Sequence, residues 1–377
     1  MIITVDIDEP LHKKRKINNG NSEVNMQDRG DAPTKIQIGS RKSQLALFQT
    51  NFVADLLKKK HANISYDIVS MTTIGDKILD VALSKIGEKS LFTKELEVAL
   101  EKKEVHMVVH SLKDLPTTLP PGMVIGAVCK RENPYDVVVF SPDYSCKSLK
   151  DLPEGSTIGT SSLRRIAQLK RNLPNMKFES VRGNLNTRLR KLDENKTYAA
   201  LILAAAGLIR LDMEHRIDAV LSPKECMYAI GQGALAIECR EDDLATIKLL
   251  SKISDEETTI CCIAERAFMR ALEGGCSVPI GVNSKIENNE LTLEGGVFSL
   301  DGSKSIIEKL SKNVYKKTPG KLKKHYAGIV APHLPCHILS ASEHLGEELA
   351  KLFIEKGAGD ILKEARTNGV ILSPPNC

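Results

Sequence analysis

Residues 108–116, VVHSLKDLP, carry an apolar run directly into a lysine, an aspartate and a proline. Together with the mostly apolar residues 105–109, the start of this stretch predicts a buried strand. Pro116 disfavours helix in the residue before it, so Asp114 is expected on a turn at the strand end. The ends of strands are where α/β folds place their chemistry, and we therefore interpret Asp114 as a carboxylate delivered into a cleft. The alternative is an ordinary polar turn with a local ion pair between Lys113 and Asp114.

The size and composition of the chain limit its class. With 377 residues, of which 42% are hydrophobic, the chain exceeds one ordinary core, and two or three domains are expected. The formal net charge of +5 selects no partner by itself. The lack of tryptophan and the aromatic content of 4% argue against a platform that stacks nucleic-acid bases, so we expect no nucleic-acid partner.

Cysteine usage points to a reducing compartment. The nine cysteines are an odd number without a CxxC pair, which argues against a disulfide framework and against a zinc ribbon. The N-terminus lacks the apolar core of a signal peptide, and the longest apolar run, residues 199–209, is too short to span a bilayer. The sequence therefore predicts a cytoplasmic protein without a metal site or a membrane partner, and we expect a monomer.

The chain begins with a segment that predicts no packed structure. Residues 1–33 are polar, lack a hydrophobic period and include the basic run KKRK at 13–16, so a disordered tail is expected, with a nuclear signal as the alternative. A strand at 36–38 then leads through the turn GSRKS at 39–43 into an amphipathic helix that begins near Leu45.

A second unit of the same kind leads into the opening stretch. Thr93 is a candidate helix cap, Lys94 lies beside it, and the helix delivers the chain to the strand at 105–109. At residues 133–135, NPY, the pattern restarts, which we interpret as a crossing into a second α/β lobe.

The second lobe shows the same alternation of strands and helices. Residues 157–159 form a short strand, and the hydroxyl groups of residues 160–162 precede a helix. A strand at 177–181 leads into a capped helix that carries Arg188.

From Asp255 the pattern changes. Residues 260–272 trace one apolar helix face, strand-like stretches follow at 280–284 and 291–298, and a helix is expected around 345–353. This arrangement predicts a small α+β domain.

Positive and hydroxyl side chains gather at the predicted strand-to-helix turns. A helix N-terminus offers free N–H groups and the positive end of its dipole to an anion, and Arg164 and Arg165 lie at such a place. Because guanidinium groups bind carboxylates bidentately, several of them at such turns predict a cleft for a polyanion. The alternative is that individual arginines pair with surface acids. The group comprises Arg41, Ser43, Lys94, Ser161, Arg164, Arg165, Arg182 and Arg188.

Two further features leave alternatives open. Phosphate is a competing anion, but the sequence lacks GxxxxGK[ST], and GQG at 231–233 is too short for a dinucleotide fingerprint, so carboxylates remain open as ligands. Cys276 follows two glycines and is expected on an accessible loop. No histidine lies in a recognisable partner motif, so a thiol hydrolase has little support, and an incidental loop thiol is the alternative. Cys261 and Cys262 are interpreted as core residues.

Five motifs, in order and with matching spacing, resemble the hydroxymethylbilane synthase family, also called the porphobilinogen deaminase family. They are GSRKSQLA at 39–46, HSLKDLP at 110–116, GTSSLRR at 159–165, VRGNLNTR at 181–188 and LEGGCSVP at 272–279. The resemblance covers residue 35 to the C-terminus. It implies a transferase of heme biosynthesis that condenses four porphobilinogen molecules head to tail, with release of ammonia, into linear hydroxymethylbilane.

The resemblance also implies a dipyrromethane cofactor, made from substrate and joined by a thioether to Cys276, and no metal. Asp114 matches the family's catalytic aspartate, which faces the pyrrole nitrogens and stabilises the cation formed when ammonia leaves. Every pyrrole carries acetate and propionate groups, and these account for the gathered arginines. The implied cofactor-binding residues are Cys276, Lys94, Lys113, Asp114, Ser161, Arg164, Arg165 and Arg188. The implied substrate-binding residues are Arg41, Ser43 and Arg182.

The implied fold is α/β, with two periplasmic-binding-protein-like lobes and a small C-terminal α+β domain. The expected divisions are a tail at 1–33, a first lobe at 34–131 plus 231–254, a second lobe at 132–230, and a domain at 255–377 that carries the cofactor cysteine. The return of the chain to the first lobe rests on the resemblance alone. The alternative function is a non-catalytic two-lobed receptor for an organic anion, which would need neither Asp114 nor Cys276.

Overall fold

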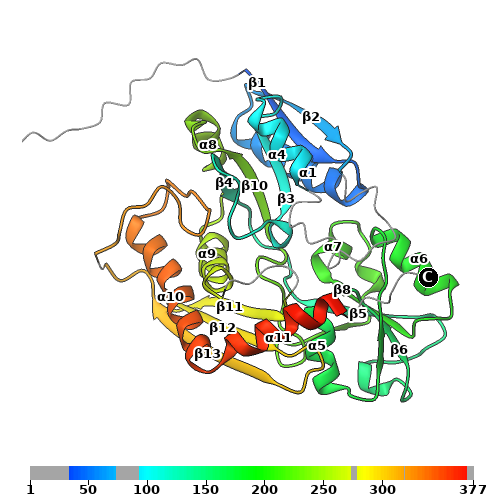
Figure 1. Ribbon diagram of the computed structural model, residues 1–377. Coiled ribbons are helices and arrows are strands. Elements are labelled where there is room, and N and C mark those ends of the chain that lie inside the picture. Colours follow the sequence, from blue (N-terminus) through cyan, green and yellow to red (C-terminus); the bar gives the residue numbers. More distant parts are fainter. Residues whose placement is uncertain (1–33, 74–92, 273–277, 318, 372–377) are drawn as a thin grey trace, which may run out of the picture. The chain divides into compact units, whose positions relative to one another are not determined.

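The computed structural model describes residues 34–73, 93–272, 278–317 and 319–371, with side chains described as far as residue 367. The predicted tail, and Cys276 with the two glycines before it, lie outside these ranges. Three sheets organise the described part of the chain (Figure 1).

The first sheet contains the strand that opened the sequence analysis. Its strands, and the helices that accompany them in the chain, are β1 (Lys35–Arg41), α1 (Gln44–Lys60), β2 (Ser65–Met71), α4 (Lys94–Glu101), β3 (Met107–Ser111), β4 (Met123–Val128), β10 (Leu235–Arg240) and α8 (Leu244–Leu250). The strand order is β2-β1-β3-β10-β4. β1 pairs in parallel with β2 and β3, whereas β10 lies antiparallel between β3 and β4. The chain therefore returns to this sheet after it has formed the second one.

The second sheet repeats this plan with shorter strands. Its elements are β5 (Asp136–Phe140), β6 (Thr157–Gly159), α5 (Leu163–Asn172), β7 (Lys177–Glu179), α6 (Leu185–Glu194), β8 (Ala200–Ala204), α7 (Ala205–Ile209) and β9 (Ala219–Val220). The strand order is β7-β6-β8-β5-β9. β6 is parallel to β7 and β8, and β5 is antiparallel to β8. All five residues of β5 are buried, which explains why this strand reads as a continuous apolar run after its first residue.

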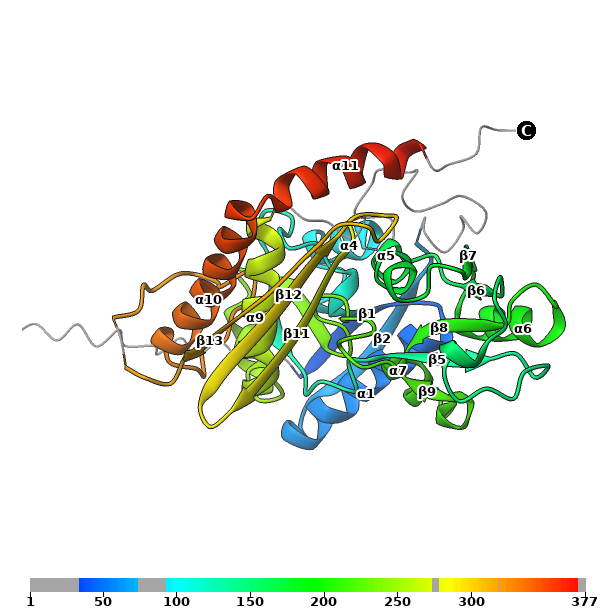
Figure 2. The ribbon, with the colours of Figure 1, turned by 90° about the horizontal axis from the view of Figure 1, so that it is seen from below.

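The third sheet is an antiparallel meander covered by helices. Its elements are α9 (Glu256–Ala271), β11 (Ile280–Glu287), β12 (Glu290–Phe298), β13 (Ser305–Asn313), α10 (Cys336–Glu355) and α11 (Ala358–Ile371). In Figures 1 and 2, α9 and α10 lie side by side against this sheet. The rings of Phe268 and Phe353 meet edge to face, with centroids 5.0 Å apart, where the two helices pack.

A buried ion pair fixes the segments that pass between the first two sheets. Nη1 and Nη2 of Arg131 donate to Oε1 and Oε2 of Glu265 at 2.7 and 2.8 Å. The N–H of Gly231 donates to the same carboxylate at 2.7 Å. Because Glu265 belongs to α9, the third region holds both crossing segments of the chain.

The predicted α/β class, with two sheet lobes and a small C-terminal α+β domain, is confirmed. Thr93 lies at the N-cap position of α4, as predicted, although its side chain makes no capping hydrogen bond. Strand β13 was not predicted, because Ile307 is exposed and polar residues such as Glu308 and Lys312 lie on the more buried face, which leaves a weak apolar alternation. No helix in the described ranges is long and apolar enough to cross a membrane.

Candidate functional site

Asp114 lies where β3 ends. The strand continues into a single 3₁₀ turn, Leu112–Asp114, and the N–H of Leu112 donates to the carbonyl oxygen of Ala234 at 3.0 Å. Leu112 and Leu115 are both 1% exposed, whereas Asp114 between them is exposed. Two buried leucines thus hold a carboxylate at the surface of the sheet's end, as the opening stretch predicted.

Lys113 occupies the same turn and has an altered proton affinity. Burial lowers the pKa of Lys113 to about 8; Asp114 opposes this shift, and the positive charge of Arg165 adds to it. The electrostatic influence of Arg165 shows that the end of β3 lies near the first turn of α5. Two motifs that are far apart in the sequence therefore meet.

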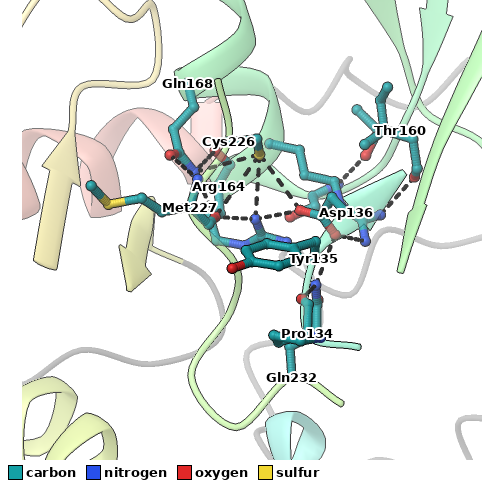
Figure 3. A network of polar contacts seen from close by, with 12 residues as sticks. Pro134, Tyr135, Asp136, Thr160, Arg164, Gln168, Cys226, Met227 and Gln232 are labelled. Atoms are coloured by element: carbon teal, nitrogen blue, oxygen red, sulfur yellow. Dashed lines mark hydrogen bonds and ion pairs between the residues drawn. The ribbon is translucent and has the colours of Figure 1, made fainter. Parts of the chain in front are cut away.

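Arg164 and Arg165 share one buried acid, Asp136, which Figure 3 shows beside Arg164. Nη1 of Arg164 donates to Oδ2 of Asp136 at 2.7 Å, and Nη2 of Arg165 donates to Oδ1 at 2.7 Å. Burial raises the pKa of the Asp136 carboxyl, but the two guanidinium groups outweigh burial and hold it well below its ordinary range. One carboxylate faces two guanidinium groups, so the cluster keeps an excess positive charge.

The two arginines differ in which guanidinium nitrogens donate hydrogen bonds to the protein. Nη1 of Arg164 also donates to the carbonyl oxygen of Met227 at 2.6 Å. Nη1 of Arg165 donates to the carbonyl oxygen of Ile202 at 2.7 Å, and its Nε, although buried, has no hydrogen-bond partner in the described ranges. Arg165 therefore retains a buried donor for an anion, whereas the side-chain hydrogen bonds of Arg164 in this part of the chain all come from its Nη1.

Arg188 connects the second sheet with Asp114. It lies in α6, whose cap Asn184 accepts a hydrogen bond from the N–H of Thr187 at 2.9 Å, and its Nε donates to the carbonyl oxygen of Gly183 at 2.8 Å. Burial lowers the pKa of Arg188, Arg165 lowers it further, and Asp114 raises it. Arg188 thus lies within electrostatic reach of groups on both sheets.

Arg182 and Ser161 lie at the neighbouring strand ends. Nε of Arg182 donates to Oγ of Ser180 at 3.3 Å. The charge of Arg182 also lowers the pKa of Arg188, although less than burial and Arg165 do. The hydroxyl of Ser161 is exposed and donates to the carbonyl oxygen of Val181 at 2.7 Å. These positions surround the first turns of α5 and α6.

The first sheet contributes Arg41 and Ser43 at the end of β1. The hydroxyl of Ser43 caps α1 by accepting from the N–H of Ala46 at 3.3 Å. Lys94 begins α4 and is exposed; in the described ranges no hydrogen bond or ion pair joins it to the arginines. Cys276 lies outside the described residues, so its distance from Asp114 is not part of this geometry.

Asp136 and Gln232 are the residues that sequence reasoning missed. Asp136 is 0% exposed and opens the apolar run of β5, and a lone acid at that place is a signal that a buried cation must face it. Gln232 is 1% exposed, and its Nε2 donates to Oδ1 of Asp136 at 2.9 Å. The motif that contains Gln232, GQG at 231–233, is too short for a nucleotide fingerprint and gives no signal of this buried contact.

Two pockets lie away from this cluster. One, of about 300 Å³, is formed by α6 and the 3₁₀ turn Glu214–Arg216, and the other, of about 220 Å³, lies between α5 and the third sheet. Neither is lined by Asp114 or by the arginine pair. In the described ranges, no group of three His, Cys, Asp or Glu side chains is arranged to hold a metal ion.

Comparisons with known proteins are consistent along the chain. Residues 36–248 match the family model described as "Porphobilinogen deaminase, dipyromethane cofactor binding domain", and residues 259–327 match "Porphobilinogen deaminase, C-terminal domain". A porphobilinogen deaminase from Nostoc sp. is 49% identical over 87% of this chain and 93% of its own length. One from Synechococcus elongatus is 54% identical over 73% of this chain and 86% of its own length. Among solved structures, the substrate-binding protein of an amino acid ABC transporter covers 58% of this chain and 91% of its own, with 15% identity and a TM-score of 0.34.

Proposed function

This chain belongs to the porphobilinogen deaminase family, and from that premise we propose which of its residues carry the reaction. Its activity is that of hydroxymethylbilane synthase, a transferase that condenses porphobilinogen head to tail, releases ammonia and gives linear hydroxymethylbilane. The alternative of a non-catalytic anion receptor is not favoured, because the curated relatives that cover most of the chain are named as deaminases.

The residues present fit a dipyrromethane with its acidic side chains. The buried Nε of Arg165 lacks an acceptor in the described ranges, and the acid that Arg165 shares with Arg164 leaves positive charge uncompensated. Carboxylates suit such donors. When bound, the dipyrromethane supplies the pyrrole to which the first substrate unit is joined. We assign the cofactor to Cys276, Lys94, Lys113, Asp114, Ser161, Arg164, Arg165 and Arg188, and the incoming substrate to Arg41, Ser43 and Arg182.

The observation that carries the catalytic assignment is the place of Asp114, an exposed carboxylate in the 3₁₀ turn that ends β3. Burial lowers the pKa of Arg188 and the charge of Asp114 opposes this shift, so Asp114 lies within electrostatic reach of an arginine on α6. The arginines bind and orient the acidic groups of the substrate, while Asp114 places negative charge where positive charge develops as ammonia leaves. Fixed opposite charge at that point lowers the barrier without a metal ion.

Asp114→Asn tests this assignment. The variant is expected to keep the mass excess of one dipyrromethane and the wild-type unfolding midpoint, and to lose about 100-fold or more in kcat, because the carboxylate is exposed and acts on the reacting pyrrole. Asp143→Asn, at an exposed position of the second lobe, is the matched control and should keep full turnover. Turnover of Asp114→Asn within a few-fold of wild type contradicts the assignment.

The remaining expectations are part of the same proposal. We assign the protein to the cytoplasm as a monomer without a nucleic-acid partner. The odd number of cysteines and the lack of tryptophan support the first and last points. Light scattering of the purified protein tests the oligomeric state, and a molar mass near twice the sequence mass contradicts it.

A further inference from the structure

Asp136 is a node that four donors share (Figure 3). Besides Arg164 and Arg165, the amide of Gln232 donates to Oδ1 at 2.9 Å, and the thiol of Cys226 lies 3.5 Å from Oδ2. Asp136 is 0% exposed, so these groups replace water completely. The direction of its carboxylate is therefore set by its neighbours alone.

Gln232 is the one neutral amide among these donors. Its Nε2 also donates to the carbonyl oxygen of Pro134 at 2.7 Å, and its own carbonyl oxygen accepts from Nε of Arg131 at 2.9 Å. Its Oε1 accepts no hydrogen bond in the described ranges, so the amide acts here as a donor. Gln232 thus joins Asp136 to both segments that cross between the first two sheets.

The crossing segments are in close contact at this point. The N–H of Glu132 donates to the carbonyl oxygen of Gly233 at 3.2 Å, and Nη2 of Arg210 donates to the same oxygen at 2.6 Å. Gly233 has φ +87°, and a Cβ there would lie 2.3 Å from the carbonyl oxygen of Glu132. Only glycine permits this close approach of the two backbone segments. The approach fixes the position of the neighbouring Gln232 side chain beside Asp136.

The orientation of Arg165 depends on Asp136. Its guanidinium group is held by the Ile202 carbonyl oxygen on one side and by Oδ1 of Asp136 on the other, which leaves Nε as the donor without a partner. Gln232 bonds to that same Oδ1 atom. A rotation of the carboxylate would therefore move the open edge of Arg165.

We propose that Gln232 is a positioning residue for the reaction: by donating to Oδ1 of Asp136 it fixes the carboxylate, and through it the edge of Arg165 that binds an acidic group of the pyrrole chain. This inference rests on the proposed function of Arg165. As the chain grows past the cofactor, Arg165 also binds an acidic group of each ring that porphobilinogen adds, and it holds this group in the ground state and in the transition state alike. Loss of the positioning contact therefore raises KM and leaves kcat nearly unchanged.

Gln232→Met tests the proposal, because methionine keeps the length of the side chain and removes the donor. In the holoenzyme, KM for porphobilinogen is expected to rise about tenfold, with kcat within about twofold of wild type. Gln168→Met is the matched control. Gln168 is a second buried glutamine, 3% exposed, whose amide donates to the carbonyl oxygens of Met227 and Arg164 and, at 3.7 Å, to the sulfur of Cys226, but not to Asp136. It should lose stability without a change in KM.

Gln232→Glu provides a second variant in case Gln232→Met does not fold. A protonated glutamate donates to Asp136 as the amide does, and an ionised one repels it, so KM of this variant should climb more steeply with pH than KM of wild type. An unchanged KM in Gln232→Met with full dipyrromethane mass overturns the proposal, as does an equal rise in Gln168→Met. Wild-type protein without dipyrromethane mass or turnover would instead contradict the proposed function itself.

Discussion

Nδ2 of Asn186 donates a hydrogen bond to Oε1 of Gln44 over 2.7 Å, and this contact joins the first turn of α6 to the first turn of α1. The two helices belong to different sheets. Gln44 follows Ser43, and Asn186 lies between Arg182 and Arg188. The contact therefore brings the proposed substrate-binding groups of the two lobes to one place.

Asn186→Ala should change substrate binding more than stability. Both side chains are exposed, so the lost hydrogen bond is expected to lower the free energy of unfolding by no more than about 1 kcal/mol. KM for porphobilinogen should rise, because the lobes are no longer joined beside the binding groups. Asn195→Ala, at the exposed C-terminal end of the same helix, should leave KM unchanged. Equal KM values for both variants and wild type would refute the role of the contact.

Lys113 should give the reaction an alkaline limb. Its pKa of about 8 lies below its ordinary value of 10.5, chiefly through burial, so the ammonium loses its charge as pH rises through about 8. We expect kcat/KM to fall there, since an anion-binding charge disappears. The folded state binds this proton more weakly than the unfolded chain, so stability rises with pH between about 8 and 10.5. Unfolding therefore does not account for the limb.

The matched variant is Lys113→Arg, whose guanidinium remains charged throughout this range. Its kcat/KM profile should stay flat through pH 8 even if its absolute value is lower. Lys147→Arg, at an exposed site, should keep the wild-type limb. A wild-type profile that is flat to pH 9.5, or an unshifted limb in Lys113→Arg, would rule out Lys113 as its source.

Asp136 should be a large source of stability. Asp136→Ala removes the acceptor that two buried guanidinium groups share, and breaking a buried pair in this way costs about 3–5 kcal/mol. Because the folded pKa lies below the ordinary 3.8, this contribution is present above that pH and is lost as pH falls through the folded value. Urea unfolding at pH 7 measures the loss. A difference from wild type below 1 kcal/mol would show that the arginines find other acceptors.

Local patterns predicted the turn of Asp114 but not the node at Asp136. The apolar run before Asp114 and the proline after it act within a few residues, and they placed the carboxylate at a strand end. Asp136 is 28 residues from Arg164 and 96 from Gln232 in the sequence, so its partners depend on the order in which the chain passes between the two lobes. No periodicity carries that information. The return of the chain to the first lobe, which brings Gln232 back to the crossing, was predicted from family resemblance alone, and the antiparallel pairing of β10 was not predicted.

The separate roles of Arg164 and Arg165 could not be predicted from local patterns either. The sequence placed Arg164 and Arg165 together at a helix start and gave them one role, with pairing to surface acids as the alternative. The structure pairs both with an acid that is buried, and in the described ranges the buried Nε of Arg165 has no hydrogen-bond partner. Helix propensity and capping residues predict where a helix begins. They do not predict which guanidinium nitrogens are bonded, because the acceptors, such as the carbonyl oxygen of Ile202, belong to other elements.

Cys276→Ala should abolish the mass excess of one dipyrromethane in the purified protein, because the thioether needs this sulfur. The buried thiols are poor substitutes: burial raises the pKa of both Cys129 and Cys226 to about 12, so little thiolate forms at neutral pH. Cys336→Ala, at a half-buried thiol on α10, is the control and should retain the excess. Intact-mass measurement of the three proteins decides the outcome. Retention of the excess in Cys276→Ala, or its loss in Cys336→Ala, would move the attachment point to another cysteine.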